Sequence, residues 1–139
     1  SRPSAQVVAQ YYNFLRLGRA GYERVVRSIL ENARYLARRV EALGPFELLG
    51  AAELFPIVVA KARNPDRLQM QDISAGLREY GWVVPAYTLP AHADHTVVLR
   101  MVVRENLSRD MIDSLCDALE RVMKRVNHDA SGPGNRPIC

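Results

Sequence analysis

The sequence predicts an α+β fold: a small, largely antiparallel sheet with helices on one face, preceded by two helices. Long amphipathic helix patterns occupy the first 43 residues, short β-branched runs separated by turn residues follow, and a further amphipathic pattern comes near the end. Such a mixture of elements is typical of helices packed over one face of a sheet. We therefore expect a helical start over residues 1–43, an α+β domain over residues 44–126, and a flexible tail over residues 127–139.

Two helices are predicted at the start of the chain. Pro3 lacks the N–H group that a first helical turn leaves unpaired, and Gly18 favours a stop after residues 4–17. The second helix has an apolar residue at every third or fourth position, which predicts one buried stripe. This stripe consists of Tyr22, Val26, Ile29, Ala33, Leu36, Val40 and Leu43. Gly44 and Pro45 then end the helix.

The middle of the chain is predicted to form strands. Residues 46–49 make a short apolar run, and residues 57–62 are β-branched and apolar. Residues 83–88 are predicted to be extended, and Pro85 indicates an edge strand or the end of a strand. Residues 97–103 form the strongest strand pattern in the chain.

Two further helices are predicted among and after these strands. The first ends at Gly81, and its apolar positions are Met70, Ile73, Leu77 and Tyr80. For the last helix, Ser108 is the expected N-cap, because its side-chain oxygen can accept a hydrogen bond from the first turn. The expected buried stripe of that helix is Met111, Leu115, Leu119, Val122 and Val126.

The composition excludes several classes of protein. The chain has 139 residues with 48% hydrophobic and 24% charged residues, which is ordinary for one globular domain. Without an apolar run of roughly 18 residues, we expect neither a membrane span nor a signal peptide. Cys116 lies in a helix pattern and Cys139 in the tail, which argues against a disulfide and favours a cytoplasmic protein. These cysteines and the three histidines lack the spacing of a metal site.

The net charge of +4 comes from 19 basic and 15 acidic residues, and 17 of the basic residues are arginine. Basic clusters can bind nucleic acid, but this chain lacks interleaved aromatic residues and groove-reading motifs. We instead expect the arginines of the second helix to lie on its solvated side, where Glu23 and Arg27 have the spacing of a helical ion pair. These arginines are Arg24, Arg27, Arg34, Arg38 and Arg39.

Arg100 interrupts the strongest strand pattern, where alternation places it on one face with Val98 and Val102. A guanidinium among valines is costly unless a carboxylate or phosphate meets it, and its planar fork can hold a carboxylate by two parallel hydrogen bonds. Alternatively, the side chain lays its stem along the sheet, and its head reaches water or a nearby Glu or Asp. Both interpretations stay open, and the pattern by itself favours the second.

Three segments, in order, resemble the pyridoxal-phosphate-dependent glutamate decarboxylases. Residues 1–22 are similar to the junction between the large cofactor domain and the small C-terminal domain of that family. Residues 77–88 resemble its L-R-x-x-G-W-x-V-P-A-[YF]-T motif, and residues 97–104 resemble its strand V-V/A-x-R-I/M-V/M-x-R. The matching segments extend over residues 1–126.

The resemblance implies the C-terminal small domain of a fold-type I enzyme that uses pyridoxal 5'-phosphate (PLP). That enzyme converts L-glutamate to 4-aminobutanoate and CO2 as a homo-oligomer. The family's arginine at the position of Arg100 holds the substrate α-carboxylate, and its serine at the position of Ser1 contacts the cofactor phosphate of the neighbouring subunit. The cofactor lysine lies in an S-x-H-K-[YF]-G motif, which surrounds neither Lys61 nor Lys124. The large PLP domain is therefore expected upstream, and the chain alone is expected neither to bind PLP nor to be active.

A second hypothesis belongs to another class of protein. The chain could be a non-catalytic α+β module that senses a ligand or mediates dimerisation through its sheet and its arginine-rich helix. An in-frame S-x-H-K motif upstream in the coding sequence separates the two hypotheses, because only the decarboxylase needs it. His92 and His95, in the loop before the Arg100 strand, are interpreted as polar loop residues, since no third ligand accompanies them.

Overall fold

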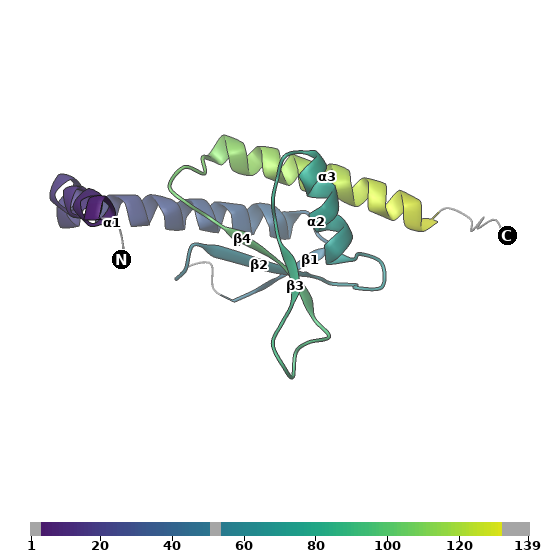
Figure 1. Cartoon of the computed structure of the whole chain (residues 1–139). Helices are drawn as coiled ribbons and strands as arrows, with labels where there is room; N and C mark the ends of the chain where they lie inside the picture. The colour runs from purple at the N-terminus through teal and green to yellow at the C-terminus, as the bar shows by residue number, and fades with distance from the viewer. Residues whose placement is uncertain (1–3, 51–53, 132–139) are drawn as a thin grey trace.

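The computed structural model describes residues 4–50 and 54–131, which form a four-stranded sheet with a helical layer over one face (Figure 1). The elements are α1 (Ser4–Ala42), β1 (Phe46–Leu49), β2 (Ile57–Ala62), α2 (Met70–Glu79), β3 (Ala86–Thr88), β4 (Val97–Val102) and α3 (Arg109–Ser131). All neighbouring strands pair antiparallel. The predicted α+β class, antiparallel sheet and one-sided helical layer are confirmed.

Helix α1 contains both of the predicted N-terminal helices, joined at a kink instead of a loop. Gly18 has φ 56° and ψ −175°, a left-handed conformation that favours glycine. Residues 4–17 consequently run in a different direction from the rest of α1 (Figure 1). The rings of Phe14 and Tyr22 meet across the kink, with centroids 5.7 Å apart. Val26, predicted to be buried, is 51% exposed, so the buried stripe of α1 is shorter than predicted.

The strand order β1-β2-β4-β3 places β4 inside the sheet. Val58 of β2 pairs with Met101 of β4, and both side chains are buried against the helices. The next pair in the register, Val59 and Arg100, therefore lies on the opposite face. Burial alternates as predicted from Leu99 to Val102, whereas Val98, expected on the outer face with Arg100, is fully buried. The sheet presents Arg100 away from the core.

The core lies between the helix-facing side of the sheet and the helices. Helices α1 and α2 contact the strands, and α3 packs on both of those helices. The large side chains that are fully buried there include Leu36, Val40, Phe46, Met70, Ile73, Leu77, Leu99, Ile112 and Leu119. These residues come from both sides of the interface, so the helical layer and the sheet share one continuous core.

Helix α3 begins as predicted but packs by a different face and runs further. Ser108 Oγ accepts a hydrogen bond of 3.3 Å from the Met111 N–H, which confirms the N-cap. Met111 itself is exposed and Ile112 is buried, so the predicted stripe is wrong at its first position. The helix extends to Ser131, past the predicted start of the tail at Asn127, and residues 132–139 of that tail lie outside the described residues.

Polar contacts connect α1 to α3 beside the core. The Tyr35 hydroxyl donates a 2.7 Å hydrogen bond to Asp113 Oδ1, and Arg39 pairs with the same carboxylate. Asn32 Nδ2 donates a 2.9 Å hydrogen bond to the carbonyl of Leu107, just before α3. Buried hydrogen-bonding groups that lose a partner are costly, so these contacts hold the two helices in one relative position.

Cys116 lies in the core on α3 and is a free thiol. Its burial raises the pKa of the thiol to about 11. The group is therefore protonated near neutral pH, where a nucleophilic cysteine has to be a thiolate. Cys116 has the character of a core residue.

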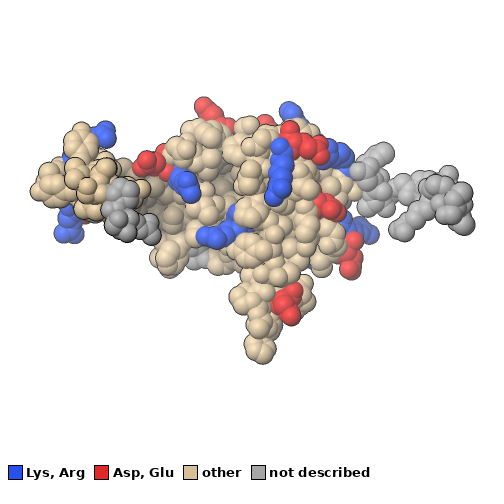
Figure 2. Space-filling view, viewed as in Figure 1, with Lys and Arg blue, Asp and Glu red and all other residues tan. Residues whose placement is uncertain are grey.

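Basic and acidic side chains are interspersed over the face that Figure 2 shows. Glu23 pairs with Arg19 at 3.0 Å, and in the described structure it makes no ion pair with Arg27. Of the arginines predicted to be solvated, Arg39 is half-buried against Asp113 and the others are exposed. None of the helices in the described part of the chain combines the length and apolarity that a membrane span requires.

Close packing of α2 on α3 gives a test of the fold. A Cβ atom added at Gly76 would lie 2.5 Å from Val122 Cγ1, closer than van der Waals contact allows. Gly76→Ala should therefore lower the free energy of unfolding by about 1–3 kcal/mol through overpacking. On a helix without a close neighbour, the same change would raise the free energy of unfolding by roughly 1 kcal/mol. The sign of the measured change therefore shows whether α2 and α3 pack this closely.

Denaturant unfolding followed by circular dichroism measures this effect. The matched control is Ala75→Gly at an exposed position of the same helix, which should cost only about 1 kcal/mol of helix propensity. A Gly76→Ala protein that is more stable than the unmodified chain contradicts the close helix packing.

Candidate functional site

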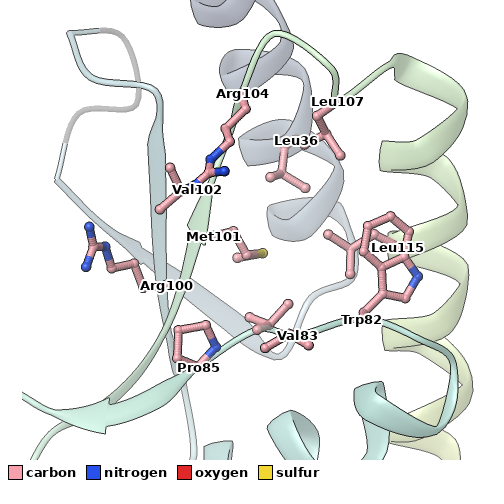
Figure 3. A pocket seen from close by; sticks show the side chains of 11 residues that line it. Leu36, Trp82, Val83, Pro85, Arg100, Met101, Val102, Arg104, Leu107 and Leu115 are labelled. Atoms are coloured by element: carbon pink, nitrogen blue, oxygen red, sulfur yellow. The ribbon is translucent and has the colours of Figure 1, made fainter. Parts of the chain in front are cut away.

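A hollow of about 360 Å³ lies beside β4, where the chain before β3 leaves the sheet (Figure 3). Strand β3 pairs with β4 only as far as Leu99, and the Arg100 N–H donates one more hydrogen bond, of 3.1 Å, to the carbonyl of Pro85. Proline has no N–H to return, so the ladder ends there, as the sequence predicts for Pro85. The hollow is lined by Leu36, Trp82, Val83, Val84, Pro85, Arg100, Met101, Val102, Arg104, Leu107 and Leu115.

Arg100 projects from the sheet face opposite the core and is exposed. Figure 3 shows its side chain pointing away from Met101 and Leu36. Within residues 4–50 and 54–131, its guanidinium makes no hydrogen bond or ion pair with another side chain. Of the two interpretations of Arg100, the structure thus shows the head of the exposed side chain reaching solvent, which is one form of the second, with no acidic partner among the described residues. Its binding of a substrate carboxylate stays a prediction.

Some other cations of the molecule pair with acids. Arg125 makes two hydrogen bonds, of 2.6 and 3.0 Å, to the carboxylate of Glu79. These bonds lower the pKa of Glu79. Arg39 pairs with Asp113, and its hydrogen bond to Tyr35 is the main cause that raises the Arg39 pKa. Such pairs connect one element to another, which is a structural role that Arg100 does not share in the described residues.

Arg104 is a second arginine among the residues that line the hollow. Its side chain folds back along the chain, so that the guanidinium lies near Val102 (Figure 3). The Arg104 side chain is exposed.

The remaining candidate residues do not join this hollow. Ser1 lies outside the described residues. Lys61 pairs with Glu47 at 3.1 Å, and Lys124 pairs with Glu120 at 2.7 Å. Both amines are thus engaged at other places, and the described residues do not fit a covalent anchor for PLP. His92 and His95 are exposed, and no group of three potential metal ligands converges within the described ranges.

Comparison with known proteins gives the family of the chain. Residues 1–63 match the family model of the pyridoxal-dependent decarboxylase conserved domain. Glutamate decarboxylase 5 of Arabidopsis thaliana is 37% identical over 126 residues, covering 91% of this chain and 26% of the relative. The glutamate decarboxylase of Aliivibrio fischeri is 35% identical over 128 residues, covering 89% of this chain and 27% of the relative. The chain thus spans about a quarter of the length of these curated relatives.

Solved structures show the same relationship in three dimensions. Glutamate decarboxylase from Lactobacillus brevis superimposes with a TM-score of 0.86 at 32% identity, over 91% of this chain and 29% of that one. Sphingosine-1-phosphate lyase from Burkholderia pseudomallei, at 19% identity and a TM-score of 0.74, shares the fold. The fold is thus that of an α+β portion of a PLP-dependent enzyme. The chain belongs to the pyridoxal-dependent decarboxylase family.

The contrast between Arg100 and Arg39 predicts effects of different size on stability. Arg100→Leu should change the free energy of unfolding by less than about 0.5 kcal/mol, because an exposed side chain without a protein partner in the described structure contributes little. Arg39→Leu removes the partner of Asp113 and Tyr35 and should destabilise the chain more than Arg100→Leu does. Urea titrations of both variants provide the comparison, and an Arg100→Leu loss as large as that of Arg39→Leu contradicts the outward position.

Proposed function

We propose that the polypeptide containing this chain is a PLP-dependent glutamate decarboxylase that converts L-glutamate to 4-aminobutanoate and CO2 in the cytoplasm. In this proposal the chain supplies the clamp for the substrate α-carboxylate, and Arg100 is the residue that forms it. The observation that carries the proposal is the outward guanidinium of Arg100 on an interior strand, beside an open hollow. The similarity of nine-tenths of the chain to glutamate decarboxylases supports the choice of substrate.

The proposed clamp follows from the chemistry of the guanidinium. Two parallel N–H groups match the two oxygens of a carboxylate, which fixes both the position and the plane of the bound group. Strand β4 is paired on both sides up to Arg100, so the base of this side chain is held firmly. Orientation of the scissile group is a large part of catalysis, because it removes rotational freedom before reaction. The described residues offer the cofactor no covalent anchor, so the proposed role of this chain is to bind and orient.

The start of α1 supports the proposed partners, a large PLP domain and a neighbouring subunit. Six apolar side chains between residues 4 and 17 are 51–67% exposed, at spacings that form one broad apolar face. They are Val7, Val8, Tyr11, Tyr12, Phe14 and Leu15. An apolar face of this breadth is characteristic of a helix that packs against another domain or subunit. Ser1, three residues before α1, is proposed to contact the cofactor phosphate of the neighbouring subunit.

Substitution of Arg100 in the full-length polypeptide tests the clamp. With PLP bound, Arg100→Ala should lower kcat/KM for L-glutamate by about 100-fold, since a charge-assisted pair of hydrogen bonds is worth about 3 kcal/mol. Arg100→Lys should recover little of this loss, because a point charge lacks the planar fork. Release of CO2 from labelled L-glutamate gives the rates.

Arg67→Ala is the matched control, because Arg67 is an exposed arginine that does not line the hollow. If the Arg100→Ala variant keeps the wild-type kcat/KM, Arg100 does not take part in the mechanism. If the unmodified, PLP-loaded polypeptide releases no CO2 from L-glutamate, the proposal of a glutamate decarboxylase is wrong. That result supports the hypothesis of a non-catalytic module.

A further inference from the structure

Val98 is fully buried although it lies on the sheet face opposite the helices. It alternates with the core residue Leu99 and shares the outer face with Arg100. In the register, its neighbours on that face are Lys61 of β2 and Tyr87 of β3. Side chains directly opposite each other on one face lie about 4.5–5.5 Å apart at Cβ. Lys61 and Tyr87 are therefore the side chains placed to cover Val98 from its two sides.

The two neighbours of Val98 are held differently. The Lys61 ammonium pairs with Glu47 of β1 at 3.1 Å, so it is directed toward β1. Tyr87 lies on the edge strand β3 and is 40% exposed, which leaves more than half of its surface covered. A tyrosine side chain has only two torsions and presents a rigid, flat apolar surface. The ring of Tyr87 therefore closes the β3 side of Val98.

Tyr87 also lies beside Arg100. Val98 and Arg100 are two residues apart on β4, about 7 Å along the strand, so Tyr87 is the diagonal neighbour of Arg100 on the outer face. Diagonal neighbours lie about 7–8 Å apart at Cα, within reach of aromatic and long side chains. The cation–π contacts of the described structure lie elsewhere, at Tyr35. The Tyr87 ring is thus placed beside the stem of Arg100 and leaves its guanidinium pointing outward (Figure 3).

We propose that Tyr87 is a positioning residue: its ring, packed on Val98, holds the stem of Arg100 upright on the outer face. An arginine loses much rotamer freedom when its fork is fixed. A wall beside the stem removes part of this entropy cost before a ligand binds, which is preorganisation. The consequence for a substrate carboxylate rests on the proposed function, whereas the packing of the ring does not.

Side-chain dynamics test the packing without any substrate. In this chain, NMR relaxation of the Arg100 Nε–H group should give an order parameter above about 0.6, the upper limit for flexible groups. Tyr87→Ala should lower it to the value of Arg67, an exposed arginine used as the reference. Tyr87→Phe should keep it, because the ring and not the hydroxyl makes the contact. Thr88→Ala, at an exposed position of the same strand, is the matched control, and Tyr87→Thr, which keeps a good strand residue, replaces Tyr87→Ala if that variant does not fold.

A double-mutant cycle in the full-length, PLP-loaded polypeptide tests the role in catalysis. Tyr87→Ala should lower kcat for L-glutamate about tenfold, because a loosely held carboxylate is less often aligned for reaction, while KM rises less than about threefold. Tyr87→Phe should restore the wild-type kcat. In the Arg100→Ala background, Tyr87→Ala should change kcat/KM less than about twofold, since a residue that acts through Arg100 has nothing left to position.

Additive losses in the double variant, or an Arg100 order parameter that Tyr87→Ala leaves unchanged, overturn the positioning role. A loss of kcat in Tyr87→Phe equal to that in Tyr87→Ala assigns the effect to the hydroxyl and overturns it as well. If Arg100→Ala is fully active, the clamp of the proposed function fails, and the order parameter still decides whether Tyr87 holds Arg100.

Discussion

The pairing register between β2 and β4 is the constraint on which the rest of the structure depends. It places Val58 opposite Met101 in the core and Val59 opposite Arg100 on the outer face. Because side chains alternate along a strand, a slip of one residue would exchange the two faces and bury a guanidinium in the core. The apolar residues of the core and the outward position of Arg100 are thus specified by the same hydrogen bonds.

The helices cover one face of the sheet and leave the other open. Helices α1 and α2 pack on the strands, while α3 fixes their positions through contacts such as that of Tyr35 with Asp113. Pro85 then ends the β3–β4 ladder at the level of Arg100, beside the hollow. The open face and the uncovered apolar helix before Gly18 agree with a chain that spans a quarter of its relatives' length.

Local patterns predicted the elements well, because each depends on nearby residues. Alternation identified β4, and the Ser108 cap and the Gly18 break were visible as single residue types in the right places. The exposed positions Val26 and Met111 were predicted to be buried, because the face that a helix buries depends on partners that are distant in the sequence. Sequence spacing likewise does not contain the direction of the Arg104 side chain, which folds back toward Val102.

A crystal structure of the full-length polypeptide with glutarate bound tests the central claim most directly. The account predicts that both terminal nitrogens of Arg100 lie about 2.7–2.9 Å from the two oxygens of one carboxylate, with the side chain on the outer face of β4. An Arg100 guanidinium paired instead with an aspartate or glutamate of the protein, with the ligand elsewhere, contradicts it.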